Sequence, residues 1–82
     1  MSEYIKLNEL LPGERAEIIY MESIGSMRRR LFDLGFFEHG LVECVGESPL
    51  GDPRAYLIRG SVVALRNKDC GEISVSRIQG ER

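Results

Sequence analysis

The sequence lacks the features of several large functional classes. Its 82 residues contain no tryptophan, one histidine and two cysteines. These residues form no Cys-x-x-Cys pair and no other spacing typical of a metal site. The chain also has no Walker loop and no glycine-rich fingerprint that could hold a nucleotide. We therefore expect no catalytic residues, no metal site and no cofactor, and predict that the protein is not an enzyme.

Basic charge and long hydrophobic runs are also scarce. Eleven Lys and Arg stand against thirteen Asp and Glu, for a net charge of −2, whereas a general nucleic-acid binder carries a basic excess. No apolar run approaches the ~20 residues that a membrane helix needs. The N-terminus shows no basic region followed by an apolar block, which a secretion signal requires. We expect one cytoplasmic domain over residues 1–82, with residues 79–82 as a flexible tail and no binding to nucleic acid.

The metal-ligating residue types are few and separated. Cys44 and Cys70 lie far apart in the sequence, and we expect both to be reduced and buried, as free cysteines in a cytoplasmic protein usually are. His39 lies in a predicted turn between Glu38 and Gly40. These residues predict a structural role for the thiols and a surface position for the histidine.

What the sequence does contain is a regular series of glycines between short alternating segments. Nine glycines divide the chain in a rhythm typical of small β-barrels. Strands are predicted at residues 14–21, 41–45, 54–59, 61–66 and 72–76, where apolar residues alternate or β-branched residues gather. The sequence therefore predicts a mainly β fold, a small barrel of about five strands.

Turn-forming residues separate these strands. Leu11-Pro12-Gly13 predicts a type II turn, because proline fixes φ at its second position and glycine supplies the positive φ at its third. Two prolines within residues 49–53 exclude a strand there and predict an exposed loop. Gly60-Ser61 predicts a two-residue hairpin. Residues 67–71 predict a single helical turn that ends at glycine.

One segment has helical periodicity. Met27, Leu31 and Leu34 follow an i, i+4, i+7 spacing, which predicts a short helix over residues 26–34, between the first and second predicted strands. Ser23 or Ser26 could cap its N-terminus, and Gly35 could take the left-handed conformation after its end.

Three consecutive arginines, residues 28–30, lie in the first turns of this helix. Asp33 has the spacing to pair with Arg29 or Arg30. Three interpretations stay open: a solvated helix face, a surface that accepts acidic groups of a partner protein, and an arginine finger that reaches a nucleotide site.

Three phenylalanines surround the end of the helix. Phe36 and Phe37 are consecutive, so both cannot easily point inward, and Phe32 lies at the edge of the apolar stripe. We expect at least one of the three to be partly exposed. They predict either an aromatic core or a partner-binding patch, because an aromatic anchor beside arginine has the composition of an interface hot spot.

At these positions the chain resembles the ferrous iron transport protein A (FeoA) family. The matching elements are, in order, Pro12-Gly13 after an apolar segment, residues 30–36 with Gly40, residues 48–53, Arg59-Gly60, residues 64–66 and residues 73–75. Together they span positions 5–77.

The resemblance implies an SH3-like barrel that serves as a cytoplasmic accessory of bacterial ferrous iron uptake. Its partner would be ferrous iron transport protein B, a membrane transporter with a cytosolic GTPase domain. The same barrel forms the C-terminal domain of iron-dependent repressors. Since the DNA-binding and dimerisation segments of such repressors do not precede it here, we expect a free-standing accessory.

We place the contact with this partner on the predicted helix and the residues after it. The predicted contact residues are Arg28, Arg29, Leu31, Phe32, Phe36 and Phe37. Two alternatives stay open. In one, a regulatory domain binds ferrous iron or another transition metal near His39 and a cysteine. In the other, the domain activates the partner's GTPase through an arginine.

Overall fold

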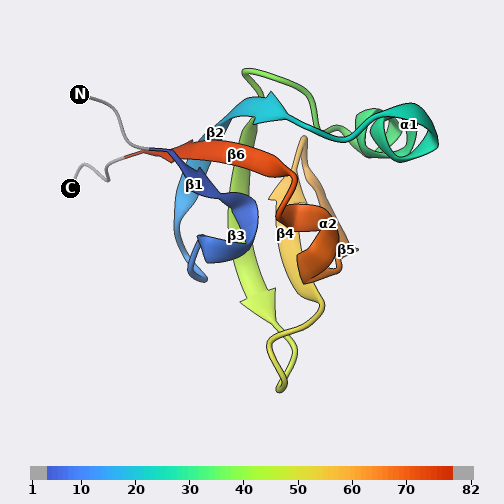
Figure 1. Cartoon of the computed structure of the whole chain (residues 1–82). Coiled ribbons are helices and arrows are strands. Elements are labelled where there is room, and N and C mark those ends of the chain that lie inside the picture. Colours follow the sequence, from blue (N-terminus) through green and yellow to red (C-terminus); the bar gives the residue numbers. More distant parts are fainter. Residues whose placement is uncertain (1–3, 79–82) are drawn as a thin grey trace.

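An antiparallel β-sheet that curls around a hydrophobic core makes up most of the fold in the computed structural model, which describes residues 4–78 (Figure 1). Its strands are β1 (Ile5–Lys6), β2 (Arg15–Met21), β3 (Leu41–Glu47), β4 (Arg54–Ile58), β5 (Ser61–Leu65) and β6 (Ile73–Arg77), in the spatial order β1-β6-β2-β3-β4-β5. The helical segments are the 3₁₀ turn η1 (Leu7–Glu9), α1 (Gly25–Leu34) and α2 (Asn67–Cys70).

The predicted mainly β fold is confirmed, with the helix between the first two predicted strands. The five predicted strands are β2 to β6, and the predicted helical turn at residues 67–71 is α2. The structure adds a sixth strand, β1, which has only two residues and is therefore too short for alternation to reveal. The predicted tail, residues 79–82, lies outside the described residues.

Irregular pairing in two strands allows the sheet to curl. The register shifts between Ile18 and Tyr20 in β2, and between Cys44 and Gly46 in β3. A β-bulge of this kind bends its strand and increases the local twist. The bulge in β3 also interrupts the alternation, which explains why the sequence predicted that this strand ends at residue 45 rather than at Glu47.

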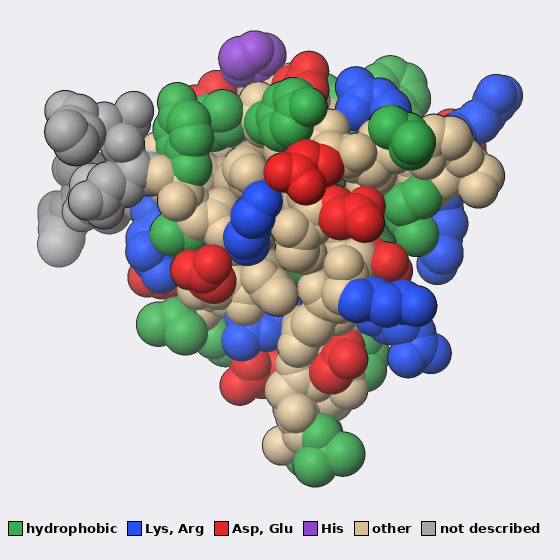
Figure 2. Space-filling view, in the orientation of Figure 1, with side chains coloured by type: hydrophobic (Ala, Val, Ile, Leu, Met, Phe, Trp, Pro, Cys, Tyr) green, Lys and Arg blue, Asp and Glu red, His purple; other side chains and the backbone are tan. Residues whose placement is uncertain are grey.

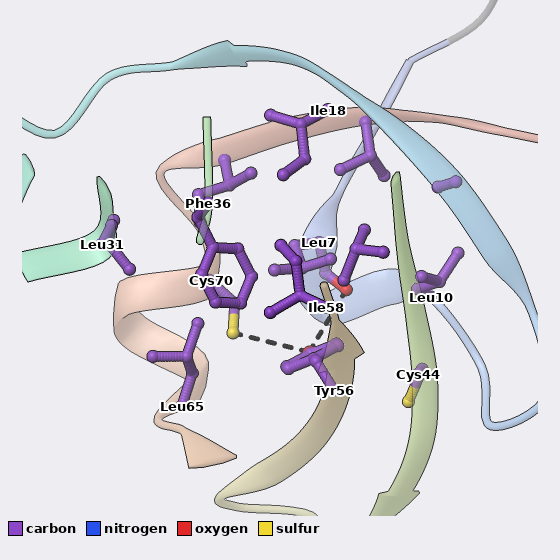
Figure 3. Packing of buried hydrophobic residues seen from close by; sticks show 14 of the residues in the cluster. Leu7, Leu10, Ile18, Leu31, Phe36, Cys44, Tyr56, Ile58, Leu65 and Cys70 are labelled. Atoms are coloured by element: carbon purple, nitrogen blue, oxygen red, sulfur yellow. Dashed lines mark hydrogen bonds between the residues drawn. The ribbon is translucent and has the colours of Figure 1, made fainter. Parts of the chain in front are cut away.

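The core is formed by side chains from almost every element (Figure 3). Both cysteines are free and fully buried, as predicted. The Cys70 thiol donates to the hydroxyl oxygen of Tyr56 at 3.4 Å, and the Tyr56 hydroxyl donates to the carbonyl oxygen of Leu7 at 3.4 Å. This chain of polar groups joins α2, β4 and η1 inside the barrel. Burial raises the pKa of the Tyr56 phenol well above its ordinary value.

Two of the predicted turns are confirmed. Gly13 has a φ of 94° and the Glu14 N–H donates to the Leu11 carbonyl at 2.9 Å, as a type II turn requires. Residues 48–53 form an exposed loop between β3 and β4, and Leu50 at its tip is 93% exposed. In Figure 1 this loop lies at the opposite end of β3 and β4 from α1.

The predicted hairpin at Gly60-Ser61 is wrong by one residue. Ile58 pairs with Ser61, so the two loop residues are Arg59 and Gly60, with φ values of 52° and 81°. Positive φ at both positions is the signature of a type I′ turn, whose twist matches that of the flanking strands. An arginine at the first position is unusual, and the sequence alone therefore favoured the later pair.

The C-terminus of α1 forms a Schellman motif. Gly35 has a φ of 109°, as predicted, and its N–H donates to the Phe32 carbonyl at 3.0 Å. The Phe36 N–H donates to the Leu31 carbonyl at 2.9 Å. Both Leu31 and Phe36 are fully buried, which provides the hydrophobic contact that accompanies this motif.

The predicted N-cap of α1 is wrong. The capping residue is Ile24, and no side chain caps the helix. Ser26 lies within the first turn, and Ser23 is buried, where its hydroxyl donates to a carboxylate oxygen of Glu72 at 2.7 Å. This hydrogen bond joins the segment between β2 and α1 to the residue just before β6.

The Tyr56 hydroxyl gives a test of the core. We expect Tyr56→Phe to lower the free energy of unfolding in urea by about 1 kcal/mol, because the Cys70 thiol and the Leu7 carbonyl each lose a buried hydrogen bond. The loss of stability is moderate because the Leu7 carbonyl still accepts a hydrogen bond from the Leu10 N–H, at 3.0 Å. Tyr20→Phe is the control, because Tyr20 is exposed. Equal effects of the two substitutions would contradict the assigned role of the buried hydroxyl.

Candidate functional site

Helix α1 stands at one end of the molecule and contacts the core along one narrow stripe (Figure 1). Leu31 is its only fully buried residue. Met27 and Leu34 are partly buried and pack against the same core, so the predicted stripe is confirmed. The rest of the helix surface is available to another molecule.

The three arginines of α1 differ in how firmly they are held. Arg28 donates to the Met21 carbonyl at 3.4 Å and lies 4.0 Å from the Glu38 carboxylate. Arg29 and Arg30 form no ion pair with an acidic side chain within residues 4–78, and the predicted pairs with Asp33 are not formed. The guanidinium groups of Arg29 and Arg30 are therefore not neutralised by an acidic side chain within the described residues.

The three phenylalanines divide between core and surface. Phe36 is fully buried, Phe37 is half-buried and Phe32 is 61% exposed, which confirms that at least one is exposed. The rings of Phe32 and Phe37 lie 5.8 Å apart in a tilted arrangement, which is a favourable geometry for an aromatic pair. The exposed Phe32 ring is therefore supported from one side by Phe37.

The exposed side of α1 carries a shallow hollow of about 590 Å³. It is lined by Gly25, Arg28, Arg29, Phe32 and Asp33. Figure 2 shows basic and hydrophobic side chains interleaved over this end of the molecule. We name the set Ile24, Arg28, Arg29, Phe32 and Phe37 the α1 surface.

The structure brings four of the six predicted contact residues together on this surface: Arg28, Arg29, Phe32 and Phe37. Leu31 is buried beneath them, which agrees with its predicted role of holding the helix in place. Phe36 was also predicted as a contact, but it lies fully inside the core, because the Schellman motif turns it inward. It supports the α1 surface from below and offers no area to a partner in this conformation.

Two residues of this region were missed by the sequence reasoning. Ile24 is 82% exposed immediately before the helix. The guanidinium carbon of Arg59 lies 5.5 Å from the centre of the Phe37 ring, within the range of a cation–π interaction. An isolated isoleucine and an arginine more than twenty residues away give no local pattern, so only the fold reveals them.

Comparison with known proteins identifies the family. A family model described as the FeoA domain matches residues 5–77. The chain belongs to the FeoA family. It is also 35% identical over 74 residues to the Fe(2+) transport protein A/Fe(2+) transporter FeoB fusion protein of Porphyromonas gingivalis. That alignment covers 90% of this chain and 9% of the fusion protein, so the chain spans less than a tenth of this relative.

Solved structures support the same assignment. Iron(II) transport protein A from Clostridium thermocellum superposes with a TM-score of 0.88 at 32% identity, over 90% of this chain and 46% of that one. The FeoA of Stenotrophomonas maltophilia, an SH3 domain protein solved with zinc, superposes with a TM-score of 0.75 at 25% identity, over 87% and 88% of the two chains. The FeoA domain described here therefore has the SH3-like fold that the resemblance implied.

The metal-ligating side chains of this FeoA domain remain dispersed in the fold. Within residues 4–78 no three His, Cys, Asp or Glu side chains gather in a way that could hold a metal ion. The His39 ring lies 3.2 Å from the Glu17 carboxylate and its side chain is 81% exposed, whereas both cysteines are in the core. The pairing of His39 with a cysteine, which the alternative function requires, is not formed.

The helices of the described region are all short. None of those within residues 4–78 is long and apolar enough to cross a membrane.

The burial of the thiols gives a test. Desolvation raises the pKa of the Cys70 thiol to about 11, so this thiol stays protonated at neutral pH, and thiolate is the reactive form. We expect both cysteines of the native domain to react with Ellman's reagent at least about a hundredfold more slowly than in the unfolded chain, because reaction must await opening of the core. One rapidly reacting thiol in the native protein would contradict this packing and would reopen the alternative metal site.

Proposed function

We propose that this FeoA domain is a non-enzymatic cytoplasmic accessory of ferrous iron uptake, which docks through its α1 surface on the cytosolic, GTPase-bearing part of a ferrous iron transporter. The observation that carries the proposal is the combination of free arginine charge and an exposed, supported aromatic ring on one helix. Arg29 has no ion pair within the described residues, and Phe32 lies beside it in the same hollow. Arginine and aromatic residues are those that dominate protein interfaces.

The fusion protein of Porphyromonas gingivalis supports the choice of partner. Its name joins a transport protein A to the transporter FeoB in a single chain. Such a fusion holds two modules at a high effective concentration, which favours a contact of modest affinity. A separate FeoA domain would make the same contact between two chains.

The physical basis of regulation would be a shift of population. A docked protein changes an equilibrium between two transporter states only by binding one of them more tightly than the other. The α1 surface can provide such a difference in affinity. Its arginines and its aromatic ring both need complementary groups, and a transporter state that presents both groups together would bind more tightly than one that does not. The partner's matching surface is then expected to be acidic, with a pocket for one aromatic ring.

Charge reversal tests the docking site. We expect the double variant Arg28→Glu/Arg29→Glu to abolish capture of the detergent-solubilised transporter. We expect Arg29→Glu or Phe32→Ala alone to raise the dissociation constant about tenfold, a loss of about 1.4 kcal/mol in binding free energy. Arg29→Glu is the cleaner single change, because Arg28 also contacts Met21 and Glu38. Binding should weaken as salt is raised, since exposed charges are screened.

A matched control separates position from net charge. Arg66→Glu/Lys68→Glu changes the charge by the same amount on and beside α2, and it should leave binding within about twofold of the wild type. An amide spectrum of each variant checks that the fold is intact. Unchanged transporter binding by the folded α1 double variant would refute the proposed docking site.

A further inference from the structure

Arg59 occupies a backbone position that does not favour arginine. It is the first loop residue of the β4–β5 turn, with a φ of 52°, where a type I′ turn prefers asparagine, aspartate or glycine. A left-handed conformation is costly for a residue with a long side chain. A strained backbone conformation persists only where the surrounding structure holds the residue in it, and such residues are concentrated at functional sites.

The side chain of Arg59 is held in place by two neighbours. Its guanidinium lies against the Phe37 ring, and its Cδ passes so close to Gly35 that a Cβ there would be only 3.2 Å away. Arg59 forms no ion pair and no side-chain hydrogen bond within residues 4–78. The fold therefore positions this charge without neutralising it.

Beside Arg59 the outer face of the sheet has a second hollow, of about 210 Å³. Its apolar lining includes Leu41, Leu57 and Ile78, and Leu41 is 62% exposed. Alternation along β3 turns Val42 and Cys44 into the core and leaves Leu41 facing outward. This hollow is thus an apolar site on the surface opposite to the core.

The charge around this sheet hollow is positive. Arg15 and Arg59 both line it. Its one acidic residue is Glu43, which lies opposite Arg15 in the register of β2 and β3. Two guanidinium groups against one carboxylate favour an anionic ligand. Arg59 also links this hollow to the α1 surface, because it lines the hollow and its guanidinium lies against Phe37, whose ring packs on Phe32.

We infer that Arg59 and the sheet hollow form a second contact site for the same transporter, which receives a segment with a carboxylate next to an apolar side chain. The carboxylate pairs with the Arg59 guanidinium, and the apolar side chain enters the hollow between Leu41 and Ile78. This inference rests on the proposed function. It adds the chemical character of the bound segment and extends the contact from α1 to the sheet.

The test compares variants of the full chain in binding to the detergent-solubilised transporter. Arg59→Asn suits the turn, so we expect its melting temperature to equal or exceed that of the wild type while the dissociation constant rises about tenfold. The salt dependence of binding should also become weaker. Leu41→Ser tests the apolar part and is expected to weaken binding about fivefold. Arg66→Asn, an equal loss of charge at another exposed arginine, should have no effect.

The outcomes separate the inference from the proposed function. If Arg59→Asn and Leu41→Ser bind normally while Arg29→Glu and Phe32→Ala do not, the second site is wrong and docking through α1 stands. If none of the four weakens binding, both proposals fail. Equal losses in Arg59→Asn and Arg66→Asn would show an effect of net charge only and would overturn the inference. If Arg59→Asn does not fold, Leu41→Ser is the deciding variant. Wild-type affinity of Leu41→Ser for the transporter would then overturn the second site.

Discussion

The burial of Leu31 and Phe36 on the two sides of Gly35 is the constraint on which the exposed end of this domain depends. Full burial of one such side chain stabilises by roughly 1.5–3 kcal/mol, and α1 has no other fully buried residue. The left-handed Gly35 allows the chain to reverse so that both side chains enter the same core (Figure 3). Everything proposed for the α1 surface follows from this anchor, because it leaves the opposite side of the helix uncovered.

Most of the fold could be predicted from the sequence, since its elements are marked locally. Alternation and glycine punctuation placed the strands β2 to β6, and the spacing of Met27, Leu31 and Leu34 placed α1. The errors occurred where a distant residue decides. Ser23 bonds to Glu72 and not to the helix, and the two-residue β1 exists only because β6 pairs with it.

The functional surface could be predicted only in part. Arg28, Arg29 and Phe32 lie within five residues of the sequence, and the i, i+3 and i, i+4 spacings place them on one side of a helix. Phe36 is the buried ring because it directly follows Gly35 in the Schellman motif, where a hydrophobic residue frequently packs against the last turn of the helix. Arg59 joins the region only through the β4–β5 turn. The chain's net charge of −2 gives no indication of this basic surface, which only the local run of arginines reveals.

The most direct test of docking through α1 is a titration of the isotopically labelled domain with the transporter in nanodiscs, followed by the attenuation of amide signals. The account predicts that the loss concentrates at Arg28, Arg29, Phe32 and Phe37 and continues to Arg59. Signals in the loop of residues 48–53, at the opposite end of β3 and β4 (Figure 1), should persist longest. Attenuation centred on that loop, with α1 unaffected, would contradict the account.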